Sequence, residues 1–170
     1  MASNTISDIT NVHDGTDSAT SSQITQVRPD AVIGHGGASL ELLKTVGEGG
    51  SEDDQFNAPT SLAVTAEGDI VVADGGNLRL QFLDKDGAFK KKVDLEFKPE
   101  DVAALTNGEL LVTGDGHGRI HVLDKEGVEI RVIQVTGAAE TWASTQGVAV
   151  DGLGRIIAYW QPGFRTQSQR

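Results

Sequence analysis

The sequence of 170 residues contains no cysteine. This absence excludes a disulfide framework, a cysteine nucleophile and any zinc module with cysteine ligands. The first residues lack the basic and apolar regions of a secretory signal, and no apolar run approaches the roughly 18 residues of a membrane-spanning helix. We therefore expect a cytoplasmic protein that does not enter a membrane.

Positive charge is also scarce, because 14 Lys and Arg residues stand against 25 Asp and Glu residues and the net charge is −11. Such a chain repels phosphate backbones unless its basic residues gather on one face. They are scattered along the sequence, and Lys90–Lys92 is their only run. Charge therefore disfavours RNA as a partner and favours a protein.

Glycine, in contrast, is abundant with 21 residues, and several glycines recur in a repeat. Residues 59–87 align with residues 99–127 without a gap, and a third copy begins at 145. A period near 40 residues is typical of repeat architectures. The aligned identities are Pro59 with Pro99, Ala63 with Ala103, Gly68 with Gly108, Val72 with Val112, Gly76 with Gly116, Arg79 with Arg119, Leu83–Lys85 with Leu123–Lys125, and Gly87 with Gly127.

Each repeat alternates short apolar segments with turns. The apolar run 70–73 predicts a strand that is buried on both faces, whereas the alternation in 78–83 predicts a strand with one wetter face. Gly68 is free to take a positive φ in a hairpin turn, and the lysine run suits an exposed outer strand. We therefore predict a four-stranded antiparallel meander in each repeat and no helix. The predicted strands of the first repeat are 62–64, 70–73, 78–83 and 89–93.

Such a unit is the blade of a β-propeller. The predicted fold class is therefore all-β, a partial β-propeller of four-stranded antiparallel blades with two full blades and half-blades at each end. The predicted organisation is a flexible leader at 1–26, a propeller segment at 27–160 and a tail at 161–170, with blades at about 59–93 and 99–135 and a third that begins at 145.

Three blades do not close a ring, since propellers have four to eight. Residues 27–46 are similar to the last two strands of a blade, and residues 145–160 are similar to the first two. Two explanations stay open. The chain is part of a longer protein, or two chains meet head to tail as a homodimer that completes six blades.

Several positions of the first repeat resemble the NHL repeat. Phe56, Asn57 and Pro59 fall in register with the Ala73-Asp74 pair and with Asn77-x-Arg79. The resemblance extends over residues 40–157. The sequence also departs from the family pattern: Ser61 and Asp101 replace a glycine, Gly114 replaces the aspartate and His117 replaces the asparagine.

The resemblance implies a non-catalytic protein-interaction module, similar to the C-terminal propellers that select substrates in tripartite-motif (TRIM) ubiquitin ligases. The RING and B-box of such ligases need cysteine, so we predict that this chain is not an enzyme and needs no cofactor. Two alternatives stay open: a fragment of a metal-dependent six-bladed propeller enzyme, similar to amidating lyases or lactonases, and an RNA-binding NHL platform.

The residues predicted to bind a partner lie in and beside the loops between strands. No residue is predicted to be catalytic or to bind a metal. His117 and His121 would stand about 13 Å apart on one strand, which is too far for one ion, so we expect solvated histidines. The arginines are expected to form an interblade hydrogen bond or ion pair with Asp74 or Asp115, and the acidic loop 48–54 is expected to face solvent. The predicted binding residues are Gln55, Phe56, Asn57, Asp74, Asn77, Arg79, Asp115, His117 and Arg119.

Overall fold

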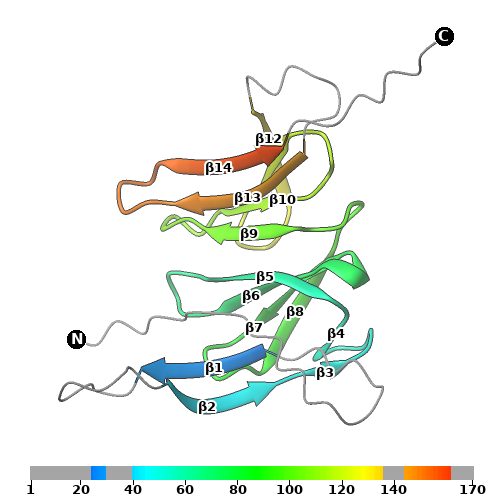
Figure 1. The fold of residues 1–170 in the computed structure, drawn as a ribbon, viewed down its shortest axis with the longest axis vertical. Coiled ribbons are helices and arrows are strands. Elements are labelled where there is room, and N and C mark those ends of the chain that lie inside the picture. The colour runs from blue at the N-terminus through cyan, green and yellow to red at the C-terminus, as the bar shows by residue number, and fades with distance from the viewer. Residues whose placement is uncertain (1–23, 30–39, 136–143, 162–170) are drawn as a thin grey trace. The chain divides into compact units, whose positions relative to one another are not determined.

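The computed structural model describes residues 24–29, 40–135 and 144–161 (Figure 1). These residues form strands, turns and a single 3-10 turn, η1 (Gly75–Asn77). The chain divides into two compact units, Met1–Asn57 and Ala58–Arg170. The parts of the predicted leader and tail at 1–23 and 162–170 lie outside the described residues, and the predicted domain boundaries stay predictions.

The first unit contains two small sheets. Strand β1 (Ile24–Pro29) pairs antiparallel with β2 (Leu40–Val46). Strand β3 (Glu48–Gly49) pairs in parallel with β4 (Gln55–Phe56), within a stretch where we expected only a loop. The acidic side chains between these strands are exposed, as expected.

The first four-stranded sheet, which we name blade 1, has the predicted meander. Its strands β5 (Pro59–Val64), β6 (Ile70–Asp74), β7 (Arg79–Leu83) and β8 (Phe89–Asp94) lie in chain order and pair antiparallel. Every residue of β6 is buried, as its apolar composition predicts. The turn before β6 contains Gly68 with a φ of +89°, which confirms the predicted hairpin.

A second sheet, blade 2, repeats this order with β9 (Asp101–Ala104), β10 (Leu110–Thr113), β11 (Arg119–Leu123) and β12 (Glu129–Gln134). A two-stranded sheet follows, with β13 (Ser144–Val150) and β14 (Ile156–Gln161). Strand β9 lies beside β5 on one side and β13 on the other, so the three sheets stack side by side (Figure 1). This arrangement confirms a partial β-propeller.

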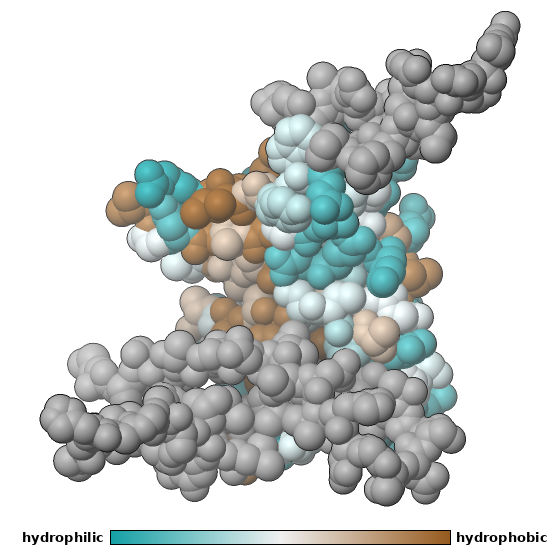
Figure 2. Space-filling model, viewed as in Figure 1, coloured by the Kyte–Doolittle hydropathy of each residue, from teal (hydrophilic) through white to brown (hydrophobic). Residues whose placement is uncertain are grey.

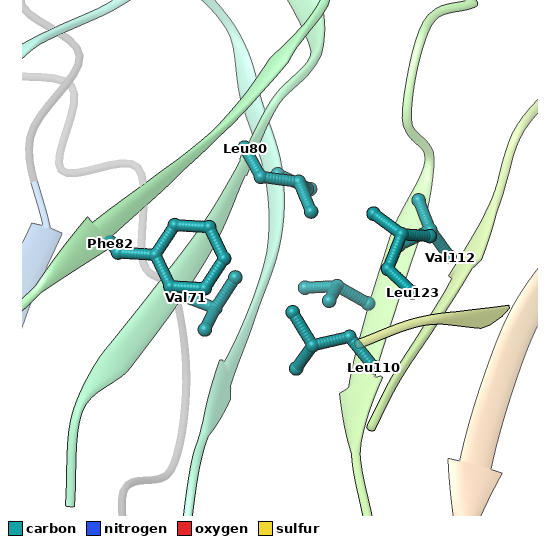
Figure 3. Close-up of a cluster of buried hydrophobic side chains, with 8 residues drawn as sticks. Val71, Leu80, Phe82, Leu110, Val112 and Leu123 are labelled. Atoms are coloured by element: carbon teal, nitrogen blue, oxygen red, sulfur yellow. The ribbon is translucent and has the colours of Figure 1, made fainter. Parts of the chain in front are cut away.

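An apolar core fills the space between blades 1 and 2. Figure 3 shows Val71, Leu80 and Phe82 of blade 1 pointing toward the side chains of blade 2. A second cluster lies between blade 2 and the β13–β14 sheet and includes Ile120 and Val148. Full burial of one such side chain stabilises the fold by about 1.5–3 kcal/mol. Each sheet therefore depends on its neighbour for stability. The blade 2 residues of the first cluster are Val102, Leu110, Val112 and Leu123.

Strand β8 is the outer edge of blade 1, and two of its three lysines are exposed, as the sequence predicts. Lys90 and Lys92 are exposed, and charge on an edge strand deters pairing with other chains. Lys91 instead links the two blades. Its Nζ lies 4.7 Å from the centre of the Phe82 ring and 3.0 Å from Glu126 Oε2.

The prediction of a wetter face on β7 is wrong. Arg79 is 3% exposed and Gln81 is fully buried, as is the whole strand. Arg79 and Gln81 can be buried on this face because both donate hydrogen bonds to the buried carboxylate of Asp74, which replaces water as their acceptor. The alternation of the sequence marked the strand correctly, but the polar face is covered.

Apolar surface is concentrated on the β13–β14 hairpin. Leu153, Ile157 and Tyr159 are among its exposed side chains, and Figure 2 shows brown surface over this hairpin. Within the described residues, no helix has the length and apolar character that crossing a bilayer requires.

Candidate functional site

The connections between the second and third strands of blades 1 and 2 lie at the same end of the two sheets. The sheets have the same strand order, and Thr60 Oγ1 at the start of β5 donates to the carbonyl of Pro99, just before β9. We name these connections, residues 75–78 and 114–118, the rim. The rim contains the predicted binding residues Asn77, Asp115 and His117.

In blade 1 the rim is held by Asp74, whose side chain is fully buried. Its Oδ2 accepts hydrogen bonds from Asn77 Nδ2 at 2.8 Å, Arg79 Nε at 2.8 Å and Gln81 Nε2 at 3.3 Å. The guanidinium and the carboxylate form an ion pair that is almost completely excluded from water. The predicted pairing of Arg79 with Asp74 is thus present, but the expectation that it connects two blades is wrong, because both residues belong to blade 1.

In blade 2 the carboxylate of Asp115 holds the rim in the same way. Its Oδ2 accepts a hydrogen bond from Arg119 Nε, and its Oδ1 accepts one from the backbone N–H of His117 at 2.8 Å. His121 Nε2 lies 3.1 Å from Asp115 Oδ2. The predicted pairing of Arg119 with Asp115 is therefore also present.

The pKa of Asp115 lies below its ordinary value. Burial acts to raise this pKa, but the hydrogen bonds from the N–H of His117, from His121 and from the Arg119 guanidinium outweigh burial. The carboxylate is therefore held in its charged form. A charged acceptor makes stronger hydrogen bonds than a neutral one, so Asp115 fixes the loop that contains His117.

The aspartate of blade 2 stands one position later than the repeat predicts, at 115 and not at 114. Gly114 has a φ of +130°, and a Cβ at this position would lie 2.1 Å from the carbonyl oxygen of Lys98. No side chain fits there, so an aspartate cannot occupy the position equivalent to Asp74. The carboxylate comes from Asp115, and the chain around Lys98 packs directly against the rim.

The prediction of a solvated His121 is wrong. The ring is buried and stacks on Phe97 with a centroid distance of 4.3 Å. Its Nδ1 lies 2.5 Å from Glu129 Oε2, while its Nε2 faces Asp115. A neutral imidazole has one N–H, so the ring donates to both carboxylates only when it is protonated. His117 is exposed, as expected.

Leu78 is a rim residue that sequence reasoning missed. Its side chain is 45% exposed, and its backbone is left-handed with a φ of +54°. Position 118 of blade 2, which aligns with Leu78, is a glycine with a φ of +67°. The difference between the repeats at this position was visible in the sequence, but its backbone conformation was not.

The remaining predicted residues, Gln55, Phe56 and Asn57, belong to the first unit. A Cβ on Gly47 would lie 2.3 Å from Cε2 of the Phe56 ring, so this ring packs on a glycine whose φ is +85°. Gln55 Oε1 accepts a hydrogen bond from the N–H of Glu52 at 3.0 Å. Gln55 and Phe56 thus shape the acidic loop, and Asn57 is exposed.

No group of three or more His, Asp or Glu side chains within the described residues is arranged to hold a metal ion. His117 and His121 do not converge, because the first lies in the rim and the second is engaged by Asp115 and Glu129.

Residues 56–81, which span β5, β6 and part of β7, match the family model described as NHL repeat. No curated protein matches the sequence.

Several solved structures are similar to the chain. Glutaminyl cyclase of Myxococcus xanthus has a TM-score of 0.51 and 20% identity, over 72% of this chain and 56% of that chain. A protein of unknown function from Bacteroides caccae has a TM-score of 0.51 and 16% identity, over 66% and 42%. The calcium-binding protein regucalcin from Agrobacterium tumefaciens has a TM-score of 0.47 and 17% identity, over 67% and 38%. The chain thus covers 38% to 56% of these structures, and the similarity shows the fold alone.

The prediction that the chain is not an enzyme must be corrected. It rested on the missing cysteines of the RING and B-box, an absence that concerns ligase chemistry only. The M. xanthus protein has the same fold and is named as an enzyme. Neither the propeller architecture nor the lack of cysteine therefore argues against catalysis. What the comparisons and the fold establish together is a β-propeller chain that contains an NHL repeat.

Proposed function

We propose that the chain is a protein-binding module whose partner docks on the rim. The observation that carries this proposal is Leu78, a large apolar side chain that is exposed in a strained backbone conformation. The left-handed conformation costs a residue other than glycine about 1–2 kcal/mol. Such strain persists where the surrounding structure enforces it, and it is frequent at binding sites.

The surroundings of Leu78 support this role. Asp74 holds the adjacent Asn77, and Asp115 holds the neighbouring loop through the N–H of His117. The rim therefore presents an apolar side chain among polar groups on two loops that are fixed before binding. A central apolar anchor with a polar surround is the usual composition of a protein interface, and a fixed surface loses little conformational entropy on binding.

The NHL repeat supports a narrower form of the proposal. In the tripartite-motif ligases that the sequence resembles, the propeller selects the substrate. On this basis the docked protein is a substrate for ubiquitin transfer, and the ligase domains belong to another part of the assembly. RNA binding, which the charge disfavours, and a head-to-tail homodimer stay open alternatives, and a cytoplasmic location stays a prediction of the sequence.

Capture of partners by three forms of the full chain tests the proposal. Wild type, Leu78→Asp and Val128→Asp are each immobilised, and the proteins that each form retains are compared by quantitative mass spectrometry. Val128 is a matched control because it is 61% exposed and lies beside a turn at the opposite end of blade 2. We expect a protein that wild type and Val128→Asp retain equally and that Leu78→Asp retains at least tenfold less, since a charge cannot fill an apolar pocket.

Both variants must first show the far-ultraviolet circular dichroism and the melting temperature of wild type. If Leu78→Asp retains every partner as well as wild type does, or if Val128→Asp loses the same partners, the rim is not the docking surface.

A further inference from the structure

A cleft of about 460 Å³ opens between blade 1 and blade 2 on the side of the outer strands. One wall consists of residues 93–97, the end of β8 and the segment that follows it. The other wall comes from β11 and β12 and includes His121, Glu129 and Val132. All lining residues belong to the second unit.

The cleft combines an apolar interior with acidic groups. Leu95, Phe97 and Leu123 are among the apolar side chains, while Asp94 and Glu96 are exposed carboxylates on one wall. Glu129 adds a half-exposed carboxylate on the facing wall.

Arg119 is the one side chain with a permanent positive charge among the lining residues, and it is already paired with Asp115. The imidazole of His121 faces Asp115 and Glu129, so it holds these carboxylates in position. The cleft is therefore acidic, and its one permanent cation, Arg119, is engaged by Asp115 of the same chain.

The comparison of the two repeats shows that these features are particular to blade 2. His121 stands where blade 1 has Gln81, and Val132 stands where blade 1 has Lys92. In each blade the two positions pair across the third and fourth strands. Blade 2 thus has an apolar residue at the position where blade 1 has a lysine, and Glu129 is bound to a ring that blade 1 lacks.

From this geometry we propose that the cleft binds an arginine side chain of a partner polypeptide. The inference rests on the proposed function in that the arginine belongs to a protein partner. The alkyl stem of the arginine packs on Leu95, Leu123 and Val132. Its guanidinium pairs with Glu96 and Glu129.

Arginine fits better than lysine for two reasons. The guanidinium is planar and can donate to two carboxylates at once, whereas the ammonium of lysine is a point charge. A guanidinium is also more weakly hydrated, so it loses less hydration when it enters a partly apolar cleft.

The probe is the capped peptide Gly-Gly-Arg-Gly-Gly, titrated into the isotope-labelled full chain and followed by the amide resonances of Gly127 and Glu129. Capped peptides with Lys or Gln in place of Arg are the comparisons. We expect saturable shifts with the arginine peptide, binding at least threefold weaker with the lysine peptide and no shift with the glutamine peptide.

Variants of the chain separate a specific site from general attraction to an acidic protein. We expect Glu96→Gln and Glu129→Gln each to weaken binding of the arginine peptide at least threefold. Glu67→Gln should leave it unchanged, because Glu67 is an exposed carboxylate in the turn before β6, outside the cleft. Glu96 has no role in the His121 network, so its variant reports on binding even if Glu129→Gln disturbs that network.

Equal binding of the three peptides, or equal weakening by Glu67→Gln and Glu96→Gln, would overturn the assignment of the cleft. A different result would contradict the proposed function. If the arginine peptide binds as expected but Leu78→Asp retains every captured partner, the rim proposal fails and the cleft stands.

Discussion

Asp74 and Asp115 occupy positions that differ by one place in the repeat, yet each accepts a hydrogen bond from the Nε of an arginine. The shift follows from the close approach of Lys98 to Gly114, which leaves no room for a side chain. Blade 2 thus keeps the aspartate–arginine pair although the backbone leaves no room for a side chain at position 114, because the carboxylate of the next residue reaches the arginine.

The carboxylate of Asp115 makes the free energy of unfolding of the chain depend on pH. Its pKa in the folded chain lies below the ordinary value of 3.8, so its ionised form stabilises the fold. This contribution is fully present above the unfolded-state pKa and is lost as the pH falls through the lower folded-state pKa. We expect wild type to be more stable than Asp115→Asn at about pH 5.5 and to lose this advantage below about pH 4.

Urea unfolding of both forms from about pH 5.5 down to about pH 2.5 checks the expectation, because the loss occurs below the ordinary pKa of the carboxyl group. Asp86→Asn is the control, because Asp86 is 71% exposed and its ion pair with Lys85 contributes little. If the difference in free energy of unfolding between wild type and Asp115→Asn does not change on acidification, the carboxylate does not stabilise the rim as a charge.

The sequence predicted the arginine pairs because each arginine lies within five residues of its aspartate across a turn. It did not predict the burial of His121, which depends on Phe97 and Glu129 from other segments. Only the folded structure brings these three side chains together.

At the scale of the elements, Asp101 joins three strands. Its Oδ1 accepts a hydrogen bond from Ser61 Oγ of β5, and its Oδ2 accepts one from the N–H of Val148 in β13 at 2.7 Å. Ser61 and Asp101 stand where the NHL pattern has glycine, so this departure of the sequence gives the first strands of the three sheets polar contacts with one another.

We expect Asp101→Ala to lower the free energy of unfolding by about 1–3 kcal/mol, because it leaves the N–H of Val148 without its acceptor and removes a link to β5. Chemical unfolding of the full chain measures this effect. The exposed Asp86→Ala is expected to change stability by less than about 0.5 kcal/mol. Equal effects of the two substitutions would show that Asp101 does not connect the sheets.

The strands themselves were largely predictable. Runs of β-branched residues between glycine turns predicted β6 and the hairpin before it, and the lysines predicted that β8 is an edge. The covered face of β7 was not predictable, because alternation identifies a face as polar without telling whether a buried partner lies opposite. For Gln81 that partner is Asp74.

At the scale of the whole molecule, the period near 40 residues predicted separate sheets that must lie against one another. The structure bears this out in the second unit, where one apolar cluster lies between each pair of neighbouring sheets. The sequence predicted the rim residues Asn77, Asp115 and His117 as binding residues. The cleft was beyond prediction, because it depends on how blade 2 meets the segment that leaves blade 1.

The packing of blade 1 on blade 2 positions both the rim and the cleft. A double-mutant cycle with Val71→Ala and Leu110→Ala, measured by urea unfolding of the full chain, tests it most directly. Both side chains are almost completely buried in the cluster between the blades (Figure 3). We predict a coupling free energy of at least about 0.5 kcal/mol between the two substitutions. Effects that add within about 0.3 kcal/mol would mean that the two blades do not share a core.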